Sequence, residues 1–457
     1  MSINENMTKG ERHATSALAS IMSMRMLGLF MILPVFSVYA QELPNSTPFL
    51  IGLAIGIYGL TQALFQIPFG MLSDRFGRKR IITIGLVIFS IGSVVAATSD
   101  SLTGIIIGRA LQGSGAISAA ILAFTADLTR EEHRTKAMAL MGMSIGMSFI
   151  FSLVAGPILN AWIGISGIFW LTSVLALIGI IILHTLVPAP LHCRFHRDTE
   201  PVPAQFKRIL RDTQLLRIDF GILVLHCLLT SLFLVVPLLL KEHMDVVEHW
   251  KLYLPIMLIS IVVMIPCIIY AEKYRHLKRV LSGAVAVLAV SQIGFIFFAQ
   301  QSSFAGIIVM LFLFFSAFNV LEASLPSLIS KVAPPESKGT AMGVYSSAQF
   351  FGAFLGGVCG GGLYHHIGIH AVFLFCLVLT LLWFISAATM KHPRYLSSYL
   401  LNIGSVDAQQ ATQLSKKLSA INGVAEVVVI VEDSVAYLKI DKTRIDINAL
   451  DAYSVTV

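Results

Sequence analysis

The stretch Gly70-Met71-Leu72-Ser73-Asp74-Arg75-Phe76-Gly77-Arg78-Lys79-Arg80 is a short charged turn between two apolar runs, each long enough to cross a lipid bilayer. Gly77 permits a tight turn, and Gly70 allows two helices to pack closely. One acidic and four basic residues lie within positions 74–80. The stretch therefore predicts two helices that reverse direction at a charged membrane surface.

The composition extends this pattern to most of the chain. Of 457 residues, 56% are hydrophobic and only 12% are charged, which is too apolar for a soluble protein of this size. Apolar windows of about 20 residues, the length that crosses roughly 30 Å of hydrocarbon, recur along it. They predict twelve membrane helices, near 14–40, 48–73, 80–98, 101–126, 137–160, 166–187, 217–240, 250–271, 279–299, 303–331, 338–364 and 368–390.

Lys and Arg set the expected orientation, because cytoplasmic loops retain basic residues. The even-numbered connections are basic, whereas the odd-numbered ones are nearly bare apart from Lys241 and Lys251 among acidic neighbours. Both termini are therefore expected in the cytoplasm, and the net charge of +7 reflects topology, with no nucleic-acid partner. The start of the chain has no small-residue cleavage site, so the first helix is expected to be a retained anchor.

Two motifs resemble those of the major facilitator superfamily. The charged turn fits the family pattern G-x-x-x-D-R-x-G-R-K between its second and third helices, and the segment from Gly108 to Gly113 fits R-x-x-Q-G in the fourth. The resemblance implies an all-α, twelve-helix membrane protein of two six-helix bundles, here residues 1–187 and 217–392. A cytoplasmic linker, 188–216, is expected between them, with an interfacial helix or a merely solvated segment as its two readings. The resemblance also implies substrate binding between the bundles and alternating access.

In that family the charged turn is expected to act as a cytoplasmic latch between the bundles. Asp127 is placed to pair with Arg78, and Asp74 could face the positive N-terminal end of the eleventh helix near Lys338. Both contacts would favour the outward-open state. The alternative is that these charges only set topology. The predicted latch consists of Gly70, Asp74, Arg75, Gly77, Arg78, Lys79 and Asp127.

Charged residues inside the membrane indicate proton coupling, because such charges are costly unless they have a partner or a function. The resemblance associates Arg109 with coupling, and structural bonding across helices is the alternative. Glu322 is the carboxylate clearly inside a helix of the second half. Burial disfavours its charged form, so Glu322 is the predicted proton carrier. Arg25 can face the same cavity and completes the set, and a static salt bridge from Glu322 to either arginine is the alternative.

A polar stripe on the second helix is expected to line the substrate cavity, because its members recur at every fourth position. Asn319 lies one turn before Glu322. Residues of the seventh and eleventh helices are weaker candidates, since a lone His in a bundle is more often structural. The predicted cavity consists of Tyr58, Gln62, Gln66, Asn319, Gln349 and His226.

The sequence predicts no catalytic site, metal or cofactor. His192, Cys193 and His196 lack a four-ligand set, as does the cluster His365, His366 and His370. The cysteines show no pairing spacing. Asp219 lies so near the expected membrane edge that it is given no role. An enzyme is not expected, because the chain lacks a phosphate-binding glycine loop and a nucleophile with its base.

Residues 394–457 change to a soluble composition and predict a small domain. An extended segment near 399–403, a helix near 407–421 and two β-rich runs, 424–431 and 434–440, indicate a ferredoxin-like β-α-β-β-α-β unit with a short final helix and strand. It lacks a C-x-x-C pair, which disfavours metal trafficking. A superfamily core with such a cytoplasmic domain is similar to one group in the drug/proton antiporter branch. The tail of this chain is expected to be regulatory or oligomeric.

The sequence therefore predicts a proton-coupled secondary transporter of a bacterial inner membrane, exporting small organic or drug-like molecules. Gly142, Gly146 and Gly156-Pro157 resemble a glycine-proline motif of antiporters and favour efflux over uptake. The expected partners are the substrate, protons and the lipid bilayer, with a monomeric transport unit that could self-associate through its tail. A proton-coupled nutrient importer and a transporter-like receptor are the alternatives.

Overall fold

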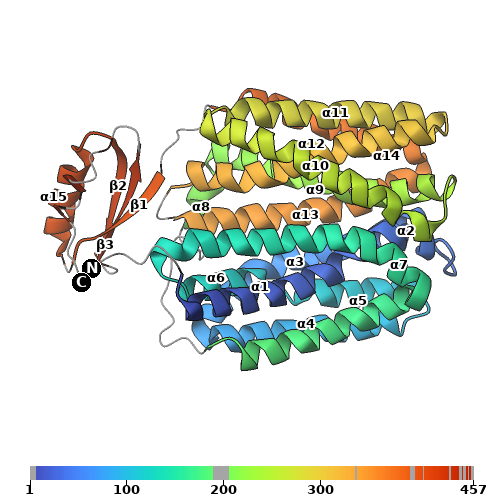
Figure 1. Ribbon diagram of the computed structural model, residues 1–457, viewed down its shortest axis with the longest axis horizontal. Helices are drawn as coiled ribbons and strands as arrows, with labels where there is room; N and C mark the ends of the chain where they lie inside the picture. The colour runs from blue at the N-terminus through green and yellow to red at the C-terminus, as the bar shows by residue number, and fades with distance from the viewer. Residues whose placement is uncertain are drawn as a thin grey trace.

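The computed structural model describes residues 7–188, 205–334, 337–391, 397–404, 406–431, 434–441, 445, 449–450 and 452–453. A bundle of long helices carries a small α+β domain at one end (Figure 1). We term the end of the bundle next to this domain the domain end, and the opposite end the far end.

The first half of the bundle runs from α1 to α7. Its helices are α1 (Lys9–Phe30), α2 (Leu33–Ala40), α3 (Pro48–Phe76), α4 (Arg78–Ala97), α5 (Leu102–Ser114), α6 (Ser118–Asp127) and α7 (Glu131–Thr185). The first predicted helix is interrupted between α1 and α2, because Pro34 cannot continue the ladder of hydrogen bonds. The fourth is interrupted at Gly115, between α5 and α6. In α7 the backbone of Gly164 has a φ of 67°, which separates the predicted fifth and sixth helices.

The second half runs from α8 to α14. Its elements are α8 (Phe206–Ile209), α9 (Thr213–Lys241), the 3-10 turn η2 (Val246–Glu248), α10 (Trp250–Lys273), α11 (Leu277–Gln300), α12 (Phe304–Val332), α13 (Lys338–His366) and α14 (Ile369–Ala388). Asp212 caps α9 by accepting hydrogen bonds from the backbone of Gln214 and Leu215. In the linker, 189–204 lie outside the described residues, and α8 has four residues. Asp212 then caps the start of α9 three residues after α8 ends, and the choice between an interfacial helix and a solvated segment stays a prediction.

Within the described residues, ten helical segments are long and apolar enough to span a membrane. One of them, Lys136–Thr185, has 50 residues and bends at Gly164, so it makes two crossings. These ten segments do not include α13, because its eight glycines lower its mean hydropathy. With two crossings for the segment that bends at Gly164 and one for α13, the described part of the bundle has twelve crossings. The predicted all-α membrane fold is confirmed.

The two halves meet along α3 and α13, where backbone packs directly on backbone. A Cβ on Gly52 would lie 2.0 Å from the carbonyl oxygen of Gly357, and one on Gly361 would lie 2.7 Å from that of Pro48. Closer to the middle of α3, a Cβ on Gly56 would lie 2.8 Å from the Phe354 oxygen. Only glycine permits this approach. These contacts, which we term the glycine seam, close the interface between the halves toward the far end.

The C-terminal domain contains a three-stranded antiparallel sheet. It is built from β1 (Ser397–Asn402), α15 (Ala408–Ser419), β2 (Val424–Ile430) and β3 (Val435–Ile440), with the strand order β1-β3-β2. Leu418 of α15 packs on Leu401 and Leu438 of the sheet. The predicted small α+β domain is confirmed, and its predicted last helix and strand fall largely outside the described residues.

Lys439 attaches this domain to the second half of the bundle. Lys439 is 2% exposed, and its Nζ donates to the carbonyl oxygens of Ser330, at 3.3 Å, and Lys331, at 3.1 Å. These oxygens lie in the last turn of α12, where the helix dipole is negative and a cation is stabilising. Asp441 adds a pairing with Arg275 at 3.8 Å.

Candidate functional site

Arg25 joins three helices of the first half through polar contacts. Its Nη1 donates to Ser118 Oγ at 2.8 Å and its Nη2 donates to Gln62 Oε1, while Gln62 Nε2 donates to Gln66 Oε1 at 3.1 Å. Tyr58 and both glutamines are buried. The predicted stripe therefore forms a closed network with Arg25 in this conformation, and its role in lining a cavity stays a prediction.

Arg109 is buried in α5 and bonds mainly to backbone. It donates to the carbonyl oxygens of Ala54 and Ile55, both at 3.4 Å, and to Gln112 Oε1 at 3.1 Å. The Tyr58 ring lies between the arginines, with its centre 5.0 Å from Cζ of Arg109 and 5.8 Å from Cζ of Arg25. Gln112 was missed as a partner, although its position three residues after Arg109 places it on the same helical face.

In the second half, Glu322 of α12 meets His226 of α9 and Gln349 of α13. Gln349 Nε2 donates to Glu322 Oε1 at 3.3 Å and lies 2.8 Å from His226 Nε2, which is 3.9 Å from Glu322 Oε2. His226 Nδ1 lies 3.3 Å from the Ile222 carbonyl oxygen. A proton on Nδ1 satisfies both contacts of the ring, since Nε2 then accepts from Gln349. We term these three residues the Glu322 cluster.

The Glu322 cluster combines depth with access. Glu322 lies ten residues before the end of α12, about 15 Å along the helix, yet its side chain is 37% exposed. Its partners are on helices that contact α3 of the first half. Within the described residues, Glu322 forms no ion pair with Arg25 or Arg109. The static salt bridge from Glu322 to one of these arginines, considered above as an alternative, is therefore not present. Asn319 instead donates to Ser260 Oγ of α10 at 2.8 Å.

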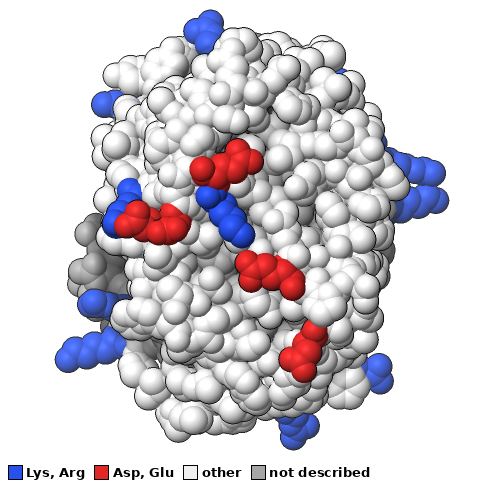
Figure 2. Space-filling model, turned by 90° about the vertical axis from the view of Figure 1, so that its right-hand side faces the viewer, with Lys and Arg blue, Asp and Glu red and all other residues white. Residues whose placement is uncertain are grey.

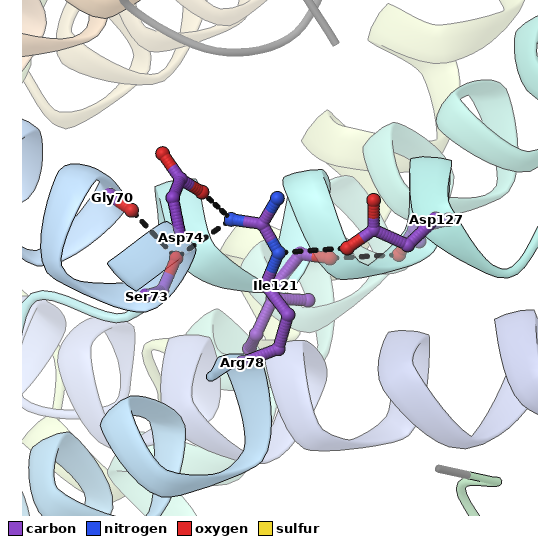
Figure 3. Close-up of polar contacts among 7 residues, drawn as sticks. Gly70, Ser73, Asp74, Arg78, Ile121 and Asp127 are labelled. Atoms are coloured by element: carbon purple, nitrogen blue, oxygen red, sulfur yellow. Dashed lines mark hydrogen bonds and ion pairs between the residues drawn. The ribbon is translucent and has the colours of Figure 1, made fainter. Parts of the chain in front are cut away.

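The charged turn surrounds Arg78, which is buried at the domain end (Figure 3). Its Nε donates to Asp127 Oδ2 at 2.7 Å, and its Nη1 donates to Ser73 Oγ, at 2.8 Å, and to Asp74. The anticipated Arg78 and Asp127 pair is thus present. The contact of Asp74 with the start of α13 stays a prediction.

The remaining latch residues have local contacts. Gly77, with a φ of 95°, ends α3. Lys79 Nζ donates to the Val187 carbonyl oxygen at 2.5 Å, which ties α4 to the end of α7. Arg75 lies over the Phe76 ring, and a Cβ on Gly70 would touch Ala119 of α6 at 3.3 Å. The turn is therefore braced within the first half.

The far end carries few charges, and acidic residues are prominent near its middle (Figure 2). The two lysines that depart from the charge pattern of the connections lie here and are both paired. Lys241 pairs with Glu42 at 3.7 Å, and Lys251 pairs with Glu248. The ends of the bundle therefore differ in charge, with the Arg- and Lys-rich connections at the domain end.

The His and Cys residues considered as ligands are dispersed or fall outside the described residues. His192, Cys193 and His196 are in the latter group. The rings of His365 and His366 lie 4.7 Å apart, and the described part of the chain contains no group of three or more His, Cys, Asp or Glu able to hold a metal.

Comparisons with known proteins point to one family. The model of the Major Facilitator Superfamily matches residues 18–357 and 278–399. The inner membrane transport protein YajR of Escherichia coli K12 is 46% identical over 437 residues, 95% of each chain. The multidrug resistance protein MdtH of Aeromonas salmonicida is 25% identical over 351 residues, 74% of this chain and 85% of that protein. A solved structure of a bacterial homologue of the human lysosomal transporter Spinster gives a TM-score of 0.68 at 14% identity, covering 84% and 98% of the two chains.

Proposed function

Because the chain belongs to the major facilitator superfamily and is a secondary membrane transporter, not an enzyme, we propose that it exports small organic, drug-like molecules in exchange for protons. Its place would be a bacterial inner membrane with both termini in the cytoplasm. The difference in charge between the two ends of the bundle supports that orientation, since basic loops stay cytoplasmic.

The Glu322 cluster carries this proposal. A carboxyl group deep in the bundle, on a partly exposed side chain and bonded to a neutral amide, can exchange a proton for a substrate group, because no fixed cation holds it charged. In the first half, Arg25 and Arg109 each contact the polar or carbonyl groups of another helix. These contacts tie each arginine to the packing of neighbouring helices in the first half.

Alternating access requires one closure at each end of the site. The close contacts of the glycine seam support its role as the closure toward the far end. The proposed closure at the domain end is the latch, in which Arg78 pairs with Asp127. In α7, a Cβ on Gly142 or Gly146 would meet no atom within 4 Å, whereas one on Gly156 would lie 2.5 Å from the Met31 oxygen. This leaves space beside α7 near the domain end and close packing near the far end, which suits rocking of the halves.

Asp74→Asn is expected to lower transport about fivefold, the effect of roughly 1 kcal/mol, without loss of folded protein. Asp127 continues to neutralise buried Arg78, so the fold survives while the latch weakens. Transport and thermal stability would be measured beside Asp100→Asn, an exposed acid on the connection between α4 and α5. Transport at the wild-type rate in Asp74→Asn would remove the latch from the mechanism.

The proposed function predicts that substrate addition releases protons from energised inside-out vesicles containing the protein. Cationic dyes, antibiotics and sugars would be screened with a pH-sensitive dye, and vesicles without the protein are the control. A response to dyes or antibiotics supports efflux by antiport. Co-movement of a sugar with protons would identify an importer instead, and silence across the whole panel would contradict drug-like export.

A further inference from the structure

Asp219 of α9 is a buried carboxyl to which the proposed mechanism has so far given no role. It is 6% exposed, and within the described residues neither carboxylate oxygen has a hydrogen-bond partner. It lies six residues after Thr213, about 9 Å along the helix from the domain end. A buried, unpartnered carboxylate is costly in its charged form, which makes proton uptake at such a position favourable.

Helices α9 and α13 run side by side from the domain end, in fixed register. A Cβ on Gly352 would lie 2.1 Å from the Leu223 carbonyl oxygen, and one on Gly356 would lie 2.2 Å from that of Cys227. Ser231 Oγ donates to the Gly356 carbonyl oxygen at 3.0 Å. The facing side chains of the two helices are therefore set by backbone contact.

This register places Tyr345 and Asp219 at a similar depth. Asp219 precedes His226 by seven residues, two turns on the same face, and Tyr345 precedes Gln349 by one turn. Because His226 and Gln349 are in contact at 2.8 Å, Asp219 and Tyr345 both lie on the domain-end side of this contact, on the same helical faces. Tyr345 lies seven residues after Lys338, about 10 Å along its helix.

Tyr345 is near enough to both acids to interact with each of them. It is buried, its hydroxyl has no hydrogen-bond partner among the described residues, and it interacts electrostatically with both Glu322 and Asp219. From the domain end inward, the polar groups on the facing sides of these helices are therefore Asp219 and Tyr345, and then the Glu322 cluster.

The other titratable groups on elements packed against α9 lie at different places. Lys338 begins α13, and Lys331 of α12 pairs with Glu272 at 2.5 Å. On α14, Cys376 faces Cys227, two turns beyond Asp219, and Tyr58 of α3 lies between the two arginines. Elements α2 and η2 meet α9 at the far end.

We propose that Asp219 and Tyr345 form a second proton-binding station between the domain end and Glu322. The inference rests on the proposed proton coupling. A proton from the domain end protonates the Asp219 carboxylate. When the Tyr345 hydroxyl, which is unbonded in this conformation, turns to hydrogen-bond with both acids, it accepts this proton and donates its own to the Glu322 carboxylate. Asp219 then returns to its charged form, Glu322 becomes neutral and Tyr345 is unchanged.

Infrared difference spectroscopy after a pH step tests this station without any substrate, because it detects the C=O stretch of protonated carboxyl groups. The full-length protein in lipid nanodiscs would be compared with three variants. Asp219→Asn is expected to remove one carboxyl band and Glu322→Gln another. Tyr345→Phe should keep both bands but shift their titration midpoints, because it removes the group between the acids.

The rate of the Glu322 band separates a proton station from a structural acid. Asp219→Asn is expected to slow its appearance at least about tenfold, which corresponds to roughly 1.4 kcal/mol, while Asp219→Glu restores a rate near wild type. If Asp219→Asn changes neither the bands nor the rate, the station is overturned and the carrier role of Glu322 stands. If Glu322→Gln removes no band, the proposed carrier itself fails and the station fails with it. Should Asp219→Asn not fold, slowing in Tyr345→Phe supports the station, and an unchanged rate in that variant overturns it.

Discussion

Replacing Glu322 with glutamine is expected to abolish proton-driven transport while the protein remains folded. Glutamine has nearly the same shape and can still bond to Gln349, but it cannot release or take up a proton in the transport cycle. Transport driven by a pH gradient would be measured in vesicles with a substrate found in the screen. Substrate exchange without a gradient should persist, because it needs the cavity and not the proton.

Glu272→Gln is the matched control for this change. Glu272 is a carboxylate at the domain end of α10 and bonds to Ser327 and Lys331 of α12, the helix that carries Glu322. The control therefore disturbs the same helix without touching the Glu322 cluster, and most proton-driven transport should remain. If Glu322→Gln transports like wild type under a pH gradient, Glu322 is not the proton carrier.

Gly357→Ala is expected to reduce transport at least about tenfold, because one added methyl group collides with the backbone of the other half. The new Cβ would lie 2.3 Å from the Gly52 carbonyl oxygen, far inside van der Waals contact, and backbone cannot rotate away as a side chain can. Closure toward the far end should fail, since the glycine seam forms only when α3 and α13 touch. Transport and thermal stability in detergent are the measurements.

Gly362→Ala provides a control on the same helix. Its Cβ would meet only Phe49 Cδ2 at 3.8 Å, an ordinary contact, so transport should stay near wild type. If Gly357→Ala transports as well as Gly362→Ala, both near the wild-type rate, the glycine seam is not needed for the cycle.

Hydrophobicity and turn residues were sufficient to predict the membrane fold. Twelve apolar windows predicted the crossings, because in lipid a helix can form all of its backbone hydrogen bonds within the segment. The breaks were harder to place. Pro34 and Gly115 interrupt helices that hydropathy alone treats as continuous, whereas the break at Gly164 falls in the predicted gap between the fifth and sixth helices. In the small domain, alternating β-branched residues were enough to predict β2 and β3.

The candidate site was only partly predictable, because contacts between helices depend on rotation and register. The motif spacing correctly anticipated the contact of Arg78 with Asp127. Sequence alone ranked His226 and Gln349 low, since nothing in their own helices shows that they meet at Glu322. Asp219 was set aside for lying near the membrane edge, yet packing of α13 against α9 buries it. Asn319 shares a helix with Glu322 but reaches α10 instead.

The hydrogen bonds between Lys439 and the end of α12 couple the position of the small domain to movement of the second half during transport. Because Lys439 holds the last carbonyl groups of α12, the domain is fastened to the second half of the bundle. Rocking of the halves would therefore move the domain relative to α1 to α7. Because the domain lies beyond the end of the bundle, a small rotation of the second half would give it a larger displacement (Figure 1). A pair of optical labels, one on α15 and one on the first half, could then follow turnover in single molecules without modifying the membrane helices around the site.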